Sequence, residues 1–485
     1  MLFHENTAIG GSAGAQGLAT LGAQQGGRGN GGAFGTAEWV AVSLADVTVH
    51  DNLAQGGGVG PNAADAGTNT GTGGVAQGGG VFLISPSSVQ ATNLSVRENT
   101  ARGGKGADSR ADSGTEAGEG GYSYGGGLRV DNATGSLEIK PAIIPVSIRQ
   151  SELVRNRSIG GDPGTGPVPE DGLGAGGLAQ GGGLDFTSLF ETRLVGVRFI
   201  GNVAIATQGK SAAGGALINA YSATRPGDDP ATLQIQNGIF RGNSVVGGDD
   251  AANQSYRETQ GGAFYNLGSG TVVSGSRFAR NSAVGGNDTG SGHVGSGLGG
   301  AVYSEASSDP SISIFNTTFV GNSALGGRRL VAGESLVEPA SGEAHGGGLY
   351  AANGTTTITG GAFVRNAAKV RARGERVAEG GAIEIGTAGE EYTNYLNTTG
   401  VLLTSNDASS ITGIALGGAV SFKGTAFADD GSTFRRNAAT SGHSAGSAYG
   451  GALLLEQETR LTGTTITHNR ALANQGFGGG IALPL

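Results

Sequence analysis

The 485-residue sequence contains no cysteine, so it can form neither a disulfide framework nor a thiolate metal site. Positive charge is also scarce, because 30 Lys and Arg residues are outnumbered by 39 Asp and Glu residues and the formal net charge is −9. Such an acidic chain is not expected to bind nucleic acid, which requires a concentrated basic surface. The sequence has no apolar run of about 18 residues, so we expect no membrane-spanning helix.

Helical periodicity and common catalytic motifs are missing as well, since no HExxH, GxSxG or P-loop pattern occurs. What the sequence has in excess is glycine, with 98 residues against 12 prolines. These glycines follow no Gly-X-Y repeat, which excludes collagen. An aperiodic chain of this composition would be close to disordered. A longer repeat is therefore needed if the chain is to fold.

A tetrad of the form apolar-x-x-Asn recurs twelve times along the chain. Its first residue is Phe in seven copies, and Ala stands two positions after the Asn in ten copies. The repeated asparagines are Asn6, Asn52, Asn99, Asn156, Asn202, Asn243, Asn281, Asn322, Asn366, Asn406, Asn437 and Asn469. This repetition predicts a ladder of amide side chains, each bonding backbone groups at a turn of its own unit or the next.

A second tetrad, Gly-Gly-Ala/Gly-apolar, alternates with the first without a miss. Between the two lie short segments such as 271–274 and 312–314, whose alternating pattern indicates strands. One unit is too small to bury its own apolar side chains, so the units must stack on one another. We therefore predict an all-β, pectate-lyase-like fold: one right-handed parallel β-helix over residues 1–485, with about twelve coils of three short strands each.

Sequence variation is concentrated between each Asn and the next Gly-Gly pair. These connections are long and Gly-rich over residues 1–180 and short over residues 400–485. Solenoids place such insertions on one flank, often the binding side. We expect loop-rich coils in the first region and tighter coils in the last.

Together, the tetrads resemble the passenger regions of chlamydial polymorphic outer-membrane proteins and related autotransporter-like proteins. The residues that carry the resemblance are GGAF at 261–264, GGAV at 299–302, GGAI at 380–383, FARN at 278–281, FVGN at 319–322 and FRRN at 434–437. The resemblance covers nearly the whole chain and implies a right-handed parallel β-helix on a bacterial surface, with adhesion as the usual role. Similar tetrads occur widely in exported β-helix proteins, so they specify the fold better than the function.

Two features depart from that family, since the sequence shows neither an export signal in MLFHENTAIGG nor a C-terminal translocator barrel. The chain also starts inside a unit, at Phe3–Asn6, and stops inside one, at Gly478–Leu485. Three interpretations stay open. The chain is a segment of a longer protein, a unit that associates head to tail through its end coils, or a capped monomer.

One row of residues is a candidate binding surface. It follows the apolar residue that ends each Gly-Gly tetrad, and in successive units it reads Arg129, Asp185, Ile218, Tyr265, Tyr303, Tyr350, Glu384 and Ser421. If the preceding apolar residue faces the core, this row faces outward. The three tyrosines, flanked by Asp185 and Glu384, would then form an aromatic strip for sugar rings or peptide. The alternative is a solvent-facing ladder that stabilises the sheet.

No residue stands out as catalytic. Acidic pairs such as Asp228-Asp229, Glu390-Glu391 and Asp429-Asp430 are expected in connections and at no common register, which indicates solubilising charge rather than a glycosidase site. The pairing of Asp185 with Arg129 or Glu384 is the one to inspect in a structure.

We predict no bound metal and no cofactor. His4, His50 and His468 occupy the x positions of the Asn tetrad and are expected to be exposed, without forming a metal site.

The function expected from the sequence is that of a non-catalytic, extracellular structural or adhesive segment of a bacterial surface protein. Its partner would be a surface protein or carbohydrate of a host or neighbouring cell. Two alternatives stay open: a carbohydrate-active β-helix enzyme, either a lyase or a glycosidase, and a self-associating filament subunit. A groove lined by two close carboxylates would favour the enzyme, whereas a smooth face rich in Gly, Ser and Thr would favour the scaffold.

Overall fold

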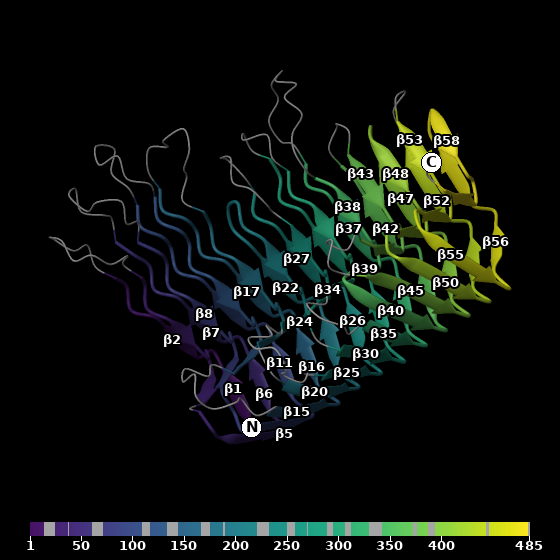
Figure 1. Cartoon of the computed structure of the whole chain (residues 1–485). Coiled ribbons are helices and arrows are strands. Elements are labelled where there is room, and N and C mark those ends of the chain that lie inside the picture. Colours follow the sequence, from purple (N-terminus) through teal and green to yellow (C-terminus); the bar gives the residue numbers. More distant parts are fainter. Residues whose placement is uncertain are drawn as a thin grey trace.

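The chain folds into a stack of coils in which strands of successive coils lie side by side (Figure 1). The computed structural model describes residues 1–13, 25–36, 38–60, 71–108, 117–132, 144–165, 175–187, 190–220, 232–249, 258–268, 270–288, 294–305, 312–328, 342–371, 376–386, 393–442 and 446–483. These residues contain no helix, and their 59 strands form five parallel sheets. The predicted fold class, a parallel β-helix of about twelve coils, is confirmed.

Each sheet takes every fifth strand and is named here after its first strand. The β1 sheet runs from β1 (Leu2–His4) to β56 (Thr465–Thr467), the β2 sheet from β2 (Thr7–Ile9) to β57 (Arg470–Leu472), and the β3 sheet from β3 (Gly29–Asn30) to β58 (Gln475–Phe477). The β4 sheet runs from β4 (Phe34–Thr36) to β59 (Ile481–Ala482), and the β5 sheet from β5 (Ala41–Ala45) to β55 (Glu458–Thr462). The β5 sheet has 11 strands, and each of the others has 12.

A coil contains five strands rather than the three predicted. One central coil consists of β26 (Ile239–Arg241), β27 (Ser244–Val246), β28 (Thr259–Gln260), β29 (Phe264–Leu267) and β30 (Gly270–Ser274). The prediction missed the β2 and β3 sheets, whose strands hold only two to four residues and are rich in Ala and Gly. Ala and Gly have low strand propensity, so stacking on neighbouring coils, not local preference, makes these segments strands.

The main core lies between the β1, β4 and β5 sheets. The residue that opens each Asn tetrad points into it, and five phenylalanines from successive coils form one column: Phe199, Phe240, Phe278, Phe319 and Phe363. Adjacent rings stack nearly parallel, with centroids 4.4 to 4.8 Å apart. The column places one large apolar side chain per coil directly against the next, which is how coils that cannot fold alone bury their apolar surface.

A second, thinner core joins the β2 and β3 sheets. It is built from small residues, among them Ala179, Ala204, Ala212, Val245 and Ala283. This core explains why Ala stands two positions after the Asn in most units: Ala204 and Ala283 are fully buried there. Side chains at this position stay small, and the largest of the three registered here is Val245, between Ala204 and Ala283.

The Asn tetrad and the Gly-Gly pair mark two corners of every coil. The residue before each of the twelve ladder asparagines has a left-handed φ of 54 to 65°. The first glycine of each pair also has a positive φ, for example 65° at Gly261. The second glycine is required by space, because a Cβ on Gly262 would lie 2.2 Å from the carbonyl oxygen of Gly300 in the next coil.

The ladder asparagines form a continuous hydrogen-bonded column. At its centre, the backbone N–H of Asn281 donates to Oδ1 of Asn322 at 3.0 Å, and Nδ2 donates to the same oxygen at 2.9 Å and to the Phe240 carbonyl at 3.1 Å. Oδ1 of Asn281 in turn accepts from the backbone N–H and from Nδ2 of Asn243, both at 3.0 Å. The side chain is fully buried, so each amide satisfies backbone groups that water cannot reach.

Beyond the β2 and β3 sheets, glycine backbones pack directly on one another. The segments that leave the β2 sheet and return to the β3 sheet interleave: Gly74 N–H donates to Gly57 O, and Gly104 N–H donates to Gly74 O, both at 2.8 Å. We call this column of Gly27, Gly57, Gly74, Gly104, Gly121, Gly161 and Gly177 the glycine seam. A Cβ on Gly104 would lie 2.0 Å from the Gly57 carbonyl oxygen, so no other residue fits. The Gly-rich connections predicted as loops therefore begin and end in packed backbone, while much of their length lies outside the described residues.

Candidate functional site

The outward row predicted from the sequence lies on the β4 sheet. In each coil the chain leaves the β3 sheet, turns at the Gly-Gly pair and enters the β4 sheet, and the row lies just after this turn. Tyr265 and Tyr303 pack there against Ala213 and Leu298 of the β3 sheet. Outward side chains of the two sheets thus meet in the angle between them, which we call the corner. Because both sheets continue from coil to coil, the corner is a long strip of partly and fully buried side chains.

The three tyrosines stack in this corner rather than facing solvent. Ring centroids are 5.3 Å apart for Tyr265 and Tyr303, and 5.1 Å apart for Tyr303 and Tyr350. Tyr265 is 9% exposed and Tyr303 is 5% exposed. Burial, reinforced by the nearby Glu305 carboxylate, raises the pKa of Tyr303 far above its usual value, and its Oη donates to Glu305 Oε2 at 2.7 Å. The prediction that these tyrosines face solvent is wrong. The alternation of residues along a strand shows that they point away from the main core, but it does not show that the β3 sheet covers them.

Asp185 and Arg129 also lie in the corner, directly in register on β19 (Leu184–Thr187) and β14 (Leu128–Asp131). Both are buried. The Arg129 guanidinium lies 4.1 Å from the ring centroid of Tyr124 and pairs with Asp131 at 3.0 Å. Burial raises the pKa of Tyr124 to about 12, although the Arg129 charge opposes the shift. Glu384 is five strands away from Asp185 in the same sheet, so the two carboxylates do not form a pair.

Glu384 belongs instead to a partly buried charged group that we call the corner cluster: Glu343, His345, Glu379, Glu384 and Lys423. His345 Nδ1 lies 2.9 Å from Glu384 Oε2, and His345 Nε2 lies 3.3 Å from Glu343 Oε2. Lys423 Nζ lies 2.6 Å from Glu379 Oε2. Glu379 and Glu384 are 3% and 2% exposed, so their charges depend on these partners.

The corner cluster is a network of ion pairs. Burial alone would lower the pKa of His345, but the Glu384 carboxylate and the bonds with Glu343 and Glu384 hold it well above its usual value. Both ring nitrogens of His345 already contact carboxylate oxygens, at 2.9 Å for Glu384 and 3.3 Å for Glu343, so a metal ion at this ring would have to displace one of these contacts. One ligand atom each of His345, Glu379 and Glu384 lies within 4.8 Å of the others, yet the Glu379 carboxylate already has the Lys423 ammonium as its cation.

Sequence reasoning placed Glu384 in the outward row but missed His345 and Glu379. Each of these two stands immediately before a Gly-Gly pair, at Gly346 and Gly380. They pair in register on β38 (Ala344–His345) and β43 (Val377–Glu379). The signal was therefore present, because the residue before each Gly-Gly pair forms a second row that faces the first across the corner.

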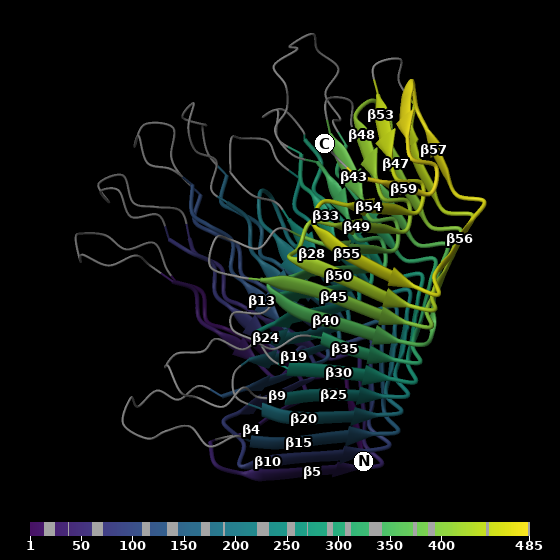
Figure 2. The same ribbon diagram turned by 45° about the vertical axis from the view of Figure 1, so that its right-hand side comes forward.

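A different surface is open to solvent: the outer face of the β5 sheet, whose strands lie side by side along the stack (Figure 2). Its central outward row is polar at all positions but two, and reads Ser43, Gln90, Ser147, Arg193, Gln234, Val272, Ser313, Thr357, Asn397, Ala428 and Arg460. We call this surface the polar face. Ser and Thr supply four of the eleven residues in the row and Gln and Asn three, so hydroxyl and amide groups predominate, although the row lacks the glycine expected of a Gly-, Ser- and Thr-rich scaffold face.

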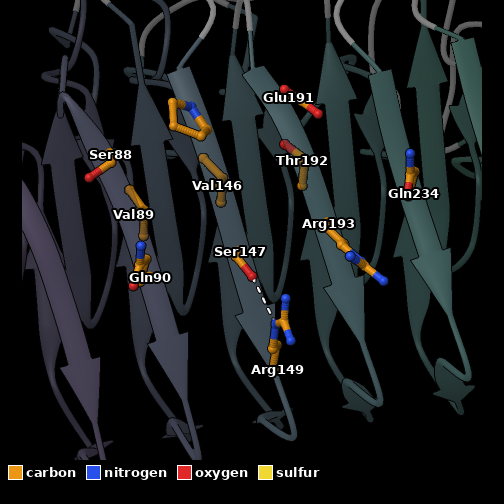
Figure 3. A pocket seen from close by; sticks show the side chains of 11 residues that line it. Ser88, Val89, Gln90, Val146, Ser147, Arg149, Glu191, Thr192, Arg193 and Gln234 are labelled. Atoms are coloured by element: carbon orange, nitrogen blue, oxygen red, sulfur yellow. Dashed lines mark hydrogen bonds between the residues drawn. The ribbon is translucent and has the colours of Figure 1, made fainter.

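A shallow hollow of about 330 Å³ lies on the polar face over β10 (Ser88–Thr92), β15 (Ile144–Arg149), β20 (Phe190–Val195) and β25 (Thr232–Gln236) (Figure 3). Gln90, Arg149, Arg193 and Gln234 project along it, and Arg149 Nε donates to Ser147 Oγ at 3.2 Å. A second hollow, of about 270 Å³, is lined by residues that include Asn397, Asp430 and Arg460. Both hollows can accept a flat or extended polar ligand.

The acidic pairs divide between strands and undescribed segments. Asp429-Asp430 lies in β50 (Ala426–Asp430), not in a connection, and Asp429 accepts hydrogen bonds from Thr398 and Thr464 at 2.5 Å each. Asp228-Asp229 and Glu390-Glu391 lie outside the described residues.

The described part of the chain holds no helix that could span a bilayer. No protein-family model matches this chain, and no curated protein is significantly similar to it.

The corner cluster predicts a pH dependence of stability. His345 gains carboxylate partners on folding, so its folded pKa exceeds the unfolded value near 6.5. A raised pKa stabilises the folded protein below about pH 6.5, and this contribution is lost as the pH rises through the folded pKa. We expect His345→Gln to reduce stability by about 2–4 kcal/mol at pH 6 and by less at pH 9. Urea unfolding of both proteins at the two pH values measures the difference. His468→Gln, at an exposed histidine, is the control; an equal effect of His345→Gln at both pH values would contradict the assignment.

Proposed function

We propose that this chain is a non-catalytic, rod-shaped adhesive segment of an extracellular bacterial surface protein, and that its polar face binds an extended acidic polysaccharide. The observation that carries this proposal is the uncovered outer face of the β5 sheet, which presents one row of mostly polar side chains along the stack. Parallel sheets are usually covered on both faces. A sheet whose outer face is left bare and is polar over most of its strands is suited to contact a long partner.

The side chains of the polar face favour a carbohydrate. The row repeats at the strand spacing of about 4.8 Å, so a polymer of similar units can meet similar side chains along its length. Ser, Thr, Gln and Asn can exchange hydrogen bonds with sugar hydroxyls. The guanidinium groups of Arg149 and Arg193 can bind carboxylate or sulfate groups in a bidentate manner. Phe315 and Tyr395, 37% and 38% exposed on the same sheet, offer apolar surface to sugar rings.

An array of neutral, carboxylated and sulfated polysaccharides tests this proposal. We expect the acidic polymers to bind, and the double variant Arg149→Ser/Arg193→Ser to lose about tenfold or more in affinity, since each charge-assisted bond contributes about 1.5–3 kcal/mol. Arg241→Ser, at an exposed arginine of the β1 sheet, is the matched control. Binding that fails for every polymer, or that weakens equally with Arg241→Ser, would contradict the proposal.

The enzyme alternative has less support from the described residues. The carboxylates of Glu379 and Glu384 are close together, but both are buried in the corner cluster, where no sugar can reach them without opening the corner. A scaffold leaves a bound polymer intact, whereas a lyase or glycosidase shortens it, so chromatography of the polymer after incubation separates the two. Self-association through the end coils stays a further alternative, which light scattering against protein concentration would reveal.

A further inference from the structure

We propose that the outer face of the first two coils binds a divalent metal ion of the zinc type through His4, His50 and Asp51, with Glu5 as a fourth ligand. His4 ends β1, and His50 ends β6 (Thr48–His50), the next strand of the same sheet. The two histidines are far apart in sequence but lie directly beside one another in the parallel register. Coiling alone brings them together.

The four side chains already form a compact group. The imidazole rings of His4 and His50 stack with centroids 4.2 Å apart and an interplanar angle of 29°. Asp51 Oδ2 lies 2.8 Å from His50 Nδ1 and 3.9 Å from His4 Nε2, so this oxygen is close to one nitrogen of each ring. Glu5 Oε1 lies 3.0 Å from His4 Nε2. One ligand atom each of His4, His50 and Asp51 lies within 4.8 Å of the others.

Two imidazole nitrogens and two carboxylate oxygens are a donor set that zinc accepts. Tetrahedral zinc with bonds of about 2.0–2.1 Å holds its ligand atoms roughly 3.3 Å apart, so the group must lengthen its 2.8 and 3.0 Å separations and shorten the 3.9 Å one, by about 0.3–0.6 Å each. The side chains can rotate to do so, because His4, Glu5 and Asp51 are 41%, 74% and 44% exposed. Calcium and magnesium prefer oxygen ligands alone, so the two nitrogens favour zinc, copper or nickel.

This group differs from the corner cluster in its charge balance. Within the described residues, neither Glu5 nor Asp51 forms an ion pair with Lys or Arg. The next residue of the same outward row, Arg97 on β11 (Ser95–Arg97), is engaged by Glu152. A metal ion would supply the positive charge that the two carboxylates lack, whereas Lys423 and His345 already supply it in the corner.

Titration of the untagged full chain with zinc chloride by isothermal calorimetry tests the site. We expect one equivalent to bind and His4→Gln/His50→Gln to weaken binding by more than about tenfold, the loss already typical when a group supporting a metal ligand is removed. His468→Gln, which alters the same position of the last Asn tetrad, should bind like the unaltered chain. Because the ion would join β1 to β6, zinc should also slow hydrogen exchange of the β1 amides.

Two results would overturn the proposal. One is zinc affinity that is unchanged in the double histidine variant, provided that its circular dichroism shows the β-rich fold of the unaltered chain. The other is calcium binding as tight as zinc binding, since that would assign the ion to carboxylates alone. Slowed exchange of β1 in the unaltered chain, together with its absence in the double variant, would place the metal at these residues.

Discussion

Replacing Asn281 with alanine is expected to lower the free energy of unfolding by about 3–5 kcal/mol, because several buried polar groups lose their partners at once. The Asn243 N–H and Nδ2 lose Oδ1 as an acceptor, and the Phe240 carbonyl loses Nδ2 as a donor. These groups lie at the buried turn between the β1 and β2 sheets, which water does not reach, so nothing replaces the lost hydrogen bonds. The effect is local to three coils, but each coil depends on its neighbours.

Urea unfolding followed by circular dichroism measures this loss, and hydrogen exchange locates it. Amides of β26 and β31 (Arg277–Ala279), which lie beside the altered asparagine turn, should exchange faster than those of distant coils. Asn397→Ala is the control, since Asn397 lies on the polar face with its side chain exposed. If Asn281→Ala and Asn397→Ala had similar midpoints, the ladder would contribute little to stability.

Substitution of Gly57 by alanine should destabilise the chain by about 3 kcal/mol, the upper end of the range for forcing extra atoms into packed structure. A Cβ there would lie 2.1 Å from the Gly11 carbonyl oxygen, and backbone cannot move aside as a side chain can. The next residue provides an unusually close control. At Gly58, a Cβ would meet only the Lys105 carbonyl oxygen at 3.8 Å, an ordinary contact.

Thermal unfolding of the two variants tests the glycine seam directly. Gly58→Ala should change stability by about 0.5 kcal/mol or less, or raise it slightly by restricting the unfolded chain. Because the two substitutions add the same methyl group to neighbouring positions, composition and unfolded-state effects nearly cancel in the comparison. Equal melting temperatures would mean that the seam opens readily and that its glycines serve no packing purpose.

The fold could be predicted from the sequence because its two tetrads mark two corners of each coil. Asparagines that recur at one position of the unit, such as Asn243 and Asn281, indicate a stacked amide ladder. Phenylalanines that recur in the same way, such as Phe240 and Phe278, indicate a core shared by successive coils. The β2 and β3 sheets could not be predicted, since strands such as Thr259–Gln260 carry no periodic signal of their own. These segments become strands because they pair with strands of the neighbouring coils, and the sequence of one repeat unit does not contain that information.

The candidate sites were predictable only in part. The row containing Tyr303 and Glu384 was read correctly as pointing away from the main core, but its burial depends on the β3 sheet packing against it. His345 escaped notice because its partner Glu384 lies in the next coil on another sheet. His4 and His50 were judged individually as exposed, whereas their proximity follows from the register that stacks one coil on another.

The one-dimensional order of the coils has a mechanical consequence for the proposed role, in which the chain would link a cell surface to a polymer. A force applied to one end would detach the outermost coil by breaking only its bonds to the next, and then load that next coil in turn. Successive ladder asparagines are separated by 31 to 57 residues, so each step would release roughly 100–200 Å of extended chain. Such a rod would yield gradually under tension and would absorb work at every step instead of failing all at once.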